Sequence, residues 1–324
     1  NMPECRAPGC MSARGPSGRQ TRPVPRKKVR QPDKRAAPIS RPRVPEGIEM
    51  ARTVWTTLLV LATAATEGLP AQRNRDRDFG LSQEEWCREA RRSDVCEVRE
   101  ETVSNTRMVD VDARGNGGVH IRGWDRPDVH VRARVVVYAD SDTEAKQIAS
   151  EIKLVTTGGR IRVDGPSRDR NWWRDRGWSA SFELEVPRNS ELMVGATNGG
   201  VIVRDVRGRM DLRTVNGGLT LDDVSGDIRG ETTNGGVDIR MTGDKWEGPS
   251  LEVRTVNGGI TLALPPNLSA ELEARAVNGG IHVDYPVTVS GLISSRRELR
   301  GTIGNGGPRI RASATNGGIS ITRR

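Results

Sequence analysis

Charged side chains cluster near the turns of the C-terminal half, and their types could support hydrolysis or elimination of a sugar polymer. The best-placed set is Asp205, Asp222 and Asp223 with Arg204 and Arg240. A hydrolase or lyase needs two or three carboxylates, or a carboxylate with a basic residue, on neighbouring elements. The outward positions of any solvated repeat carry the same residue types. We therefore expect a solvated face and no catalytic residues, with a polysaccharide-active enzyme as the alternative.

A tryptophan-rich segment is the strongest candidate for ligand binding. Residues 167–180 read SRDRNWWRDRGWSA and place Trp172, Trp173 and Trp178 among arginines. Indole rings stack on sugars or insert at membrane interfaces, and arginines add charge attraction. The alternative is that these tryptophans fold back and cover the open end of the neighbouring repeat. Both interpretations stand at this point.

Four cysteines divide into two pairs. Cys5 and Cys10 lie within residues 1–49, whereas Cys87 and Cys96 lie close together farther along the chain. An even, closely spaced pair in an exported protein predicts a disulfide between Cys87 and Cys96.

Metal and cofactor sites are not expected. The only histidines are His120, His130 and His282, and none has zinc-ligand spacing from the cysteines. Calcium-binding β-rolls repeat Gly-Gly-x-Gly-x-Asp, whereas the residues after each Gly-Gly pair here have a strand pattern. We predict no cofactor and no metal.

Residues 1–71 have the composition of a leader. Residues 1–49 are rich in Pro and Arg, a composition that predicts disorder. Residues 50–71 contain Arg52, then an apolar stretch from Val54 to Ala65, and end in Leu-Pro-Ala. This order predicts a signal peptide with Met50 as the true start. An uncleaved anchor is the alternative. The leader holds 13 of the 51 basic and 5 of the 42 acidic side chains, so 38 basic and 37 acidic side chains remain in the rest. This balance argues against a nucleic-acid partner.

An Asn-Gly-Gly triplet repeats through the C-terminal part and is followed by an apolar, variable, apolar pattern. The copies recur at nearly regular intervals. We predict structural turns at Asn198, Asn216, Asn234, Asn257, Asn278 and Asn316; Asn305 begins another copy, and Asn116 begins an isolated one.

The repeat predicts a flattened, parallel β-helix-like solenoid. A coil of this length cannot bury its own apolar residues, so identical positions stack into a continuous core. We expect glycines with φ above zero at the corner and an amide ladder of asparagines. Asp205–Gly208 and Asp223–Gly226 indicate a second corner about halfway through each coil. An antiparallel meander of Asn-Gly hairpins is the alternative.

The remaining chain is expected to be β-rich. Residues 72–100 form a charged lead-in that carries the cysteine pair, residues 101–193 an N-terminal part with period-two strands, and residues 194–324 the solenoid. One short helix is expected after Ser141, where Ala145, Ile148, Ala149 and Ile152 give one apolar face.

From about Thr102 to Arg324 the chain resembles a bacterial family of putative adhesins, domain of unknown function 4097. The resemblance lies in Gly115–Val119, in the strand Glu183–Pro187 and in the run of Asn-Gly-Gly coils. The family has no established catalytic residues, so the resemblance assigns no site. The tryptophan-rich insertion and the short final step from Asn305 to Asn316 depart from its pattern.

Together these observations predict an exported, non-enzymatic, adhesin-like protein. Its repetitive face or its tryptophan loop would bind a surface, a glycan or a protein partner. A structural envelope component without a defined ligand is a further alternative. We expect the mature chain to lack a transmembrane span and to reach the periplasm, the cell envelope or the exterior.

Overall fold

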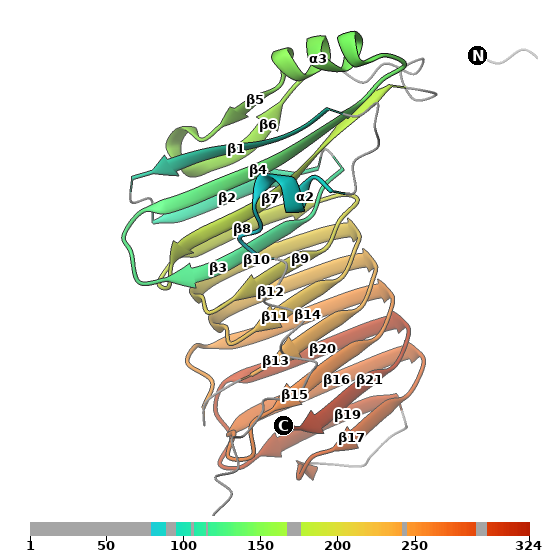
Figure 1. Cartoon of the computed structure of the whole chain (residues 1–324). Helices are drawn as coiled ribbons and strands as arrows, with labels where there is room; N and C mark the ends of the chain where they lie inside the picture. Colours follow the sequence, from blue (N-terminus) through green and yellow to red (C-terminus); the bar gives the residue numbers. More distant parts are fainter. Residues whose placement is uncertain are drawn as a thin grey trace, which may run out of the picture. The chain divides into compact units, whose positions relative to one another are not determined.

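The computed structural model describes residues 79–88, 95–104, 107–114, 116–166, 176–241, 245–289 and 297–324, which all belong to one compact unit, residues 65–324. The predicted leader and signal peptide lie outside these residues. Two large sheets, A and B, make up most of the unit (Figure 1). In spatial order, sheet A contains β1 (Val95–Val103), β4 (Val129–Tyr138), β7 (Gly177–Pro187), β3 (Val119–Trp124), β9 (Val201–Arg204), β11 (Leu219–Asp222), β13 (Val237–Arg240), β15 (Ile260–Leu264), β21 (Ile319–Arg323) and β17 (Ile281–Asp284). Sheet B contains β18 (Thr288–Val289), β19 (Glu298–Ile303), β16 (Ala270–Asn278), β20 (Arg309–Asn316), β14 (Ser250–Asn257), β12 (Ser225–Asn234), β10 (Arg207–Asn216), β8 (Glu191–Ala196), β2 (Met108–Ala113), β6 (Arg160–Asp164) and β5 (Lys153–Val155).

Each coil consists of one long strand in sheet B followed by one short strand in sheet A. Neighbouring coils pair in parallel, with Leu212 beside Gly230 and Leu219 beside Val237. Inward side chains such as Leu212, Leu219 and Leu221 are fully buried between the two sheets. The predicted flattened solenoid is therefore confirmed, and the antiparallel meander is wrong. The stacking also includes β2 and β3, which precede the Asn-Gly-Gly run.

Asparagines form a hydrogen-bonded ladder along the first corner. The amide groups of Asn216 and Asn234 each donate to the Oδ1 of the asparagine on the preceding coil, at 2.7 and 2.8 Å. In stacking order the ladder runs through Asn116, Asn198, Asn216, Asn234, Asn257, Asn316 and Asn278. Asn116, an isolated copy in the sequence, is thus its first member. Asn305 instead stands in the turn between β19 and β20.

Close approach of the coils explains the first glycine of each triplet. A Cβ on Gly217 would lie 2.2 Å from the carbonyl oxygen of Gly199, and a Cβ on Gly199 would lie 2.3 Å from that of Gly117. Neither Gly199 nor Gly217 has φ in the left-handed region. The expectation of φ above zero is therefore wrong for these two glycines, whereas Gly317 and Asn116 have φ of 158° and 71°. Gly199 and Gly217 are required because stacked backbones leave no room for a side chain.

Left-handed backbone also occurs at the second corner. Asp205 and Asp223 have φ of 56° and 52°, and the following Gly208 and Gly226 have φ of 141° and 125°. Aspartate is one of the few residue types other than glycine that visits this region readily. The predicted second corner thus lies between the short strand of one coil and the long strand of the next.

Buried threonines stabilise the first corner from inside. The hydroxyl groups of Thr214, Thr232 and Thr255 donate to the carbonyl oxygens of Gly199, Gly217 and Gly235, at 2.7–2.8 Å. Each threonine stands two positions before a ladder asparagine. A buried carbonyl without a partner is costly, so these bonds compensate for the tight turn.

Antiparallel strands and the helix α3 (Asp142–Glu151) cover the N-terminal end of the solenoid, and the short helix α2 (Gln83–Trp86) lies against outward side chains of β4. β4 pairs with both β1 and β7. The predicted helix is α3, with Ser141 as its N-cap and Ala145 buried. Sequence reasoning missed α2, which is too short for a periodic signal, although Ser82 and Glu85 form a capping box.

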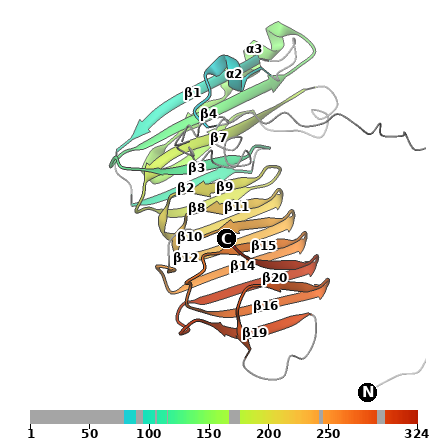
Figure 2. The ribbon, with the colours of Figure 1, turned by 60° about the horizontal axis from the view of Figure 1, so that its bottom comes forward.

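The coils at the C-terminal end are not stacked in chain order. β20 lies between β14 and β16 (Figure 2). β21 lies between β15 and β17. The last coil of the chain therefore occupies a slot between the two coils that precede it in sequence. β19 pairs with β16 on the side away from β20.

Candidate functional site

The outward side chains of β10, β12 and β14 form a checkerboard of charge on sheet B. Along each strand the sign of the side-chain charge alternates, and the register of the parallel strands places opposite charges beside one another on neighbouring strands. Asp211 pairs with Arg229, and Arg229 pairs with Glu252. The alternating residues are Arg209, Asp211 and Arg213 on β10, Asp227, Arg229 and Glu231 on β12, and Glu252 and Arg254 on β14.

Ion pairs within each strand hold the checkerboard in place. Arg213 binds Asp211 at 2.9 Å, and Arg229 binds Glu231 at 2.7 Å. The hydrogen bond from Arg229 lowers the pKa of Glu231, and the charges of Arg213 and Arg254 lower it further. Because each charge is surrounded by charges of the opposite sign, the net electrostatic potential of the face is weak and attracts a simple ion little.

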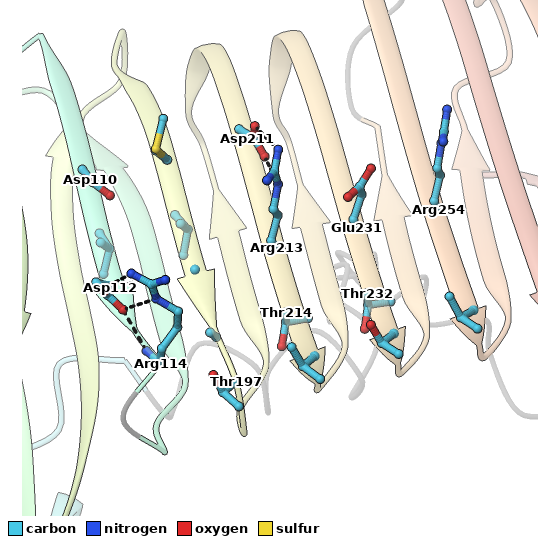
Figure 3. Close-up of a pocket in the computed structure, with 18 residues that line it drawn as sticks. Asp110, Asp112, Arg114, Thr197, Asp211, Arg213, Thr214, Glu231, Thr232 and Arg254 are labelled. Atoms are coloured by element: carbon cyan, nitrogen blue, oxygen red, sulfur yellow. Dashed lines mark hydrogen bonds and ion pairs between the residues drawn. The ribbon is translucent and has the colours of Figure 1, made fainter. Parts of the chain in front are cut away.

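The checkerboard is interrupted at β8, where the two corresponding outward positions hold no charge. Met193 stands between Asp110 on β2 and Asp211 on β10, and Gly195 stands between Asp112 and Arg213. A hollow of about 680 Å³ lies over this interruption. Its lining extends from Asp110 and Asp112 across β8 to Glu231 and Arg254 (Figure 3).

Two carboxylate–guanidinium pairs flank the hollow. Arg114 donates to both carboxylate oxygens of Asp112, at 2.8 and 2.5 Å, and Arg213 does the same to Asp211 at 2.9 Å (Figure 3). The bond from Arg114 lowers the pKa of Asp112, so this pair is charged at neutral pH. Each fixed pair presents donors and acceptors side by side.

The floor of the hollow is apolar and open. Met193 is 47% exposed, and a Cβ placed on Gly195 would meet nothing closer than the Arg114 side chain at 4.0 Å. Six large apolar side chains are exposed within the described part of the chain, and all except Tyr138 belong to sheet B: Met108, Met193, Val215, Val256 and Val277. Exposed apolar side chains gathered on one face are typical of an interaction surface.

Of the predicted tryptophan site, only Trp178 lies within the described residues. It is 6% exposed, and its indole Nε1–H donates to the carbonyl oxygen of Pro166 at 3.3 Å. Its ring lies against Gly165, which the Ile152 side chain also approaches. Trp178 is therefore a core residue and offers no stacking face, which corrects the prediction for this position. Trp172 and Trp173 lie outside the described residues.

The five charged residues considered for catalysis occupy two kinds of position in the coils. Arg204, Asp222 and Arg240 are register partners on short strands of sheet A. Asp205 and Asp223 are instead the left-handed residues of the second corner. Burial raises the pKa of Asp205, and the charge of Asp223 raises it further. Their positions are explained by the corner and by a solvated face.

The structure joins Cys87 and Cys96 in a disulfide with a Cα–Cα distance of 5.8 Å. This bond ties the α2 segment to β1. Arg132 lies over the Trp86 ring, 5.2 Å from its centroid, and donates to the buried Glu183 at 2.6 Å. Burial raises the pKa of Glu183 despite this partner.

Sequence reasoning missed the hollow over β8, although part of its signal was present. The alternating signs in Arg209–Arg213 and Asp227–Glu231 are visible in the printed sequence. Met193 and Gly195 are the exceptions at equivalent positions of the first repeat. Their importance depends on Asp110 and Asp112, which are distant in the sequence and are placed beside them only by the fold.

Comparison with known proteins identifies relatives in fold. The model of the family described as Toastrack DUF4097 matches residues 109–322. Similar solved structures include a putative cell adhesion protein from Clostridium sporogenes (13% identity, 70% of this chain and 100% of that chain, TM-score 0.37). Others are a putative adhesin from Bacteroides fragilis (10%, 71% and 97%, 0.34) and a putative lipid binding protein from Parabacteroides distasonis (11%, 70% and 96%, 0.28). None of the curated proteins matches the chain. Within the described ranges, no helix is long and apolar enough to cross a membrane.

Proposed function

The chain belongs to the Toastrack DUF4097 family, and we propose that this member is an exported, non-enzymatic binding protein that holds a glycan in the hollow over β8. The interruption of the charge checkerboard at Met193 and Gly195 is the observation that carries this proposal. On β12 and β14, Arg229 is already paired with Glu231 and Arg254 with Glu252, so a ligand gains little by displacing these pairs. Over β8 no ion pair has to be broken.

The lining of the hollow favours a ligand rich in hydroxyl groups. Each sugar hydroxyl both donates and accepts, and the Asp112–Arg114 and Asp211–Arg213 pairs supply both functions at fixed positions. Met193 supplies an apolar surface for the C–H face of a sugar ring. A volume of about 680 Å³ lies within the range of small-ligand sites. The neighbouring coils extend the same polar face, which suits a polymer.

A substitution that fills the hollow with a side chain tests the proposal. Gly195→Gln places a side chain over β8 in open space, and Thr220→Gln places the same side chain on the outer face of sheet A as a matched control. A glycan array probed with the wild-type protein identifies the ligand. We expect Gly195→Gln to weaken binding at least about tenfold, or about 1.4 kcal/mol, at an unchanged melting temperature. Equal binding by both variants, or an array without any bound glycan, would contradict the proposal.

Export rests on the n-region, apolar stretch and small-residue end of residues 50–71. The Cys87–Cys96 disulfide supports it, because such bonds persist in oxidising compartments. N-terminal sequencing of the protein purified from its native cells should give Gln72 as the first residue. A first residue before Gln72 would refute cleavage at this site.

A further inference from the structure

The C-terminal coil, residues 309–324, occupies a slot that the rest of the chain forms on both sides. β20 pairs with β14 and β16, and β21 pairs with β15 and β17. The amide of Asn316 donates to Asn257 and its Oδ1 accepts from Asn278, at 2.7 and 2.8 Å. A coil in the slot therefore has its backbone and asparagine hydrogen-bonding groups paired along both of its edges.

The strands that form the walls of the slot come earlier in the sequence than the coil that fills it. Both β14 and β16 precede β20 in the sequence, so the two walls are synthesised before their occupant. Inward residues of the coil, including Ile310, Ala312 and Ile321, are fully buried against these walls. Without the coil, four strand edges and this apolar surface would be unpaired, which is the usual condition for pairing with another chain.

The turn of residues 304–308 joins the coil to the part of the chain that precedes it. β19 lies on the far side of β16, so the turn of residues 304–308 crosses the beginning of β16 to reach the slot. The Asn305 N–H donates to Ser269 Oγ at 3.2 Å, and the Gly306 N–H donates to the Ile303 carbonyl at 3.0 Å. Gly304 and Gly306 have φ of 55° and 76°, a conformation that glycine leaves at little cost.

We propose that this slot is also an assembly site, in which the C-terminal coil of a second copy replaces the chain's own. Every contact of the coil within the slot is the same whichever copy supplies it, so exchange loses none of them. Exchange requires the coil to leave its own slot and the 304–308 turn to open. The chain's own coil is favoured by an effective concentration in the millimolar range. Exchange is therefore expected when copies fold together at high concentration or are crowded on a surface.

Single cysteines on two full-length copies distinguish exchange from chance contact. Glu252 on β14 and Arg311 on β20 are register partners with outward side chains. One copy carries Glu252→Cys, the other carries Arg311→Cys and a small tag, and Cys5 and Cys10 are replaced by Ser in both. A disulfide between the two copies forms in register only if β20 of one copy lies beside β14 of the other.

The two copies are refolded together from denaturant at high concentration, oxidised, and separated by size without reductant. The matched control pairs Glu252→Cys with Arg229→Cys, which are register partners on β14 and β12, inside the continuous stack. We expect several-fold more linked heterodimer from the Glu252–Arg311 mixture than from the control. A second mixture, Glu273→Cys with Arg311→Cys, should behave like the first because β16 is the other wall. Equal, background yields from all three mixtures would overturn the proposal.

Discussion

Replacing one internal asparagine of the ladder tests whether the ladder stabilises the stack of coils. Asn234 donates to Asn216 at 2.8 Å and accepts from Asn257 at 2.8 Å. Asn234→Ala removes both hydrogen bonds and leaves one acceptor and one donor without these partners. Asn278 is the last member of the ladder and makes one such bond, to Asn316 at 2.8 Å. The two positions differ mainly in the number of bonds lost.

The expected magnitude follows from that number. A hydrogen bond contributes about 0.5–1.5 kcal/mol, and exposed partners regain water, which favours the lower end. Asn234→Ala should therefore lower the free energy of unfolding by about 1–2 kcal/mol, and Asn278→Ala by about half as much. For a unit of this size such a loss lowers the melting temperature by about 2–8 °C.

Denaturant unfolding followed by circular dichroism measures both variants on the same scale. Asn305→Ala is the matched control, because Asn305 has the same Gly-Gly context but stands outside the ladder. It should change stability little. The reasoning is refuted if Asn234→Ala is as stable as wild type, or if Asn278→Ala costs as much as Asn234→Ala.

Three further predictions test separate parts of the account. Gly217→Ala places a Cβ 2.2 Å from a carbonyl oxygen and should lower the free energy of unfolding by about 3 kcal/mol or more. Gly280→Ala is the control, because a Cβ there has nothing within 4 Å and should change the free energy of unfolding little. Thermal unfolding compares the two variants. Burial raises the pKa of Glu183, so its contribution to stability is complete below the ordinary glutamate pKa and is lost as pH rises through the folded-state pKa. Glu183→Gln should therefore gain stability relative to wild type as pH rises above the ordinary glutamate pKa, and a constant difference in urea titrations at several pH values would argue against this. Asp205→Asn removes repulsion from Asp223 and keeps a residue suited to left-handed backbone, so it should preserve or raise the melting temperature at neutral pH; a marked loss would show that the carboxylate is needed.

The sequence alone was sufficient to predict the architecture, because the repeat constrains every coil in the same way. The spacing of Asn198, Asn216 and Asn234 identified the corner, and the apolar pairs such as Leu219 and Leu221 identified the core. Because equivalent positions of the repeat stack on one another, both signals can be recognised without knowing which distant residues are in contact. The reason for the corner glycines was not predictable, since φ above zero and close approach of backbones select the same residue type.

The order of the coils was out of reach for a related reason. Ile310 and Ala312 fit beside Leu251 and Val253 as well as beside Leu272 and Ala274. A repeat that makes coils interchangeable carries little information about which coils are neighbours. The hollow over β8 was missed because its rims come from β2 and β10, which only the register of sheet B brings to either side of Met193.

The most direct test of the proposed site is the methyl signal of Met193. The chain has seven methionines, and Met193 belongs to the floor of the hollow, whereas Met210 and Met241 are buried in the core. Carbon-13 labelling of the methionine methyl groups, with Met193→Leu to assign the signal, follows all of them during titration with the glycan selected on the array. The Met193 signal should shift and saturate while those of Met210 and Met241 stay in place. An unchanged Met193 signal at saturating glycan would contradict the placement of the binding site over β8.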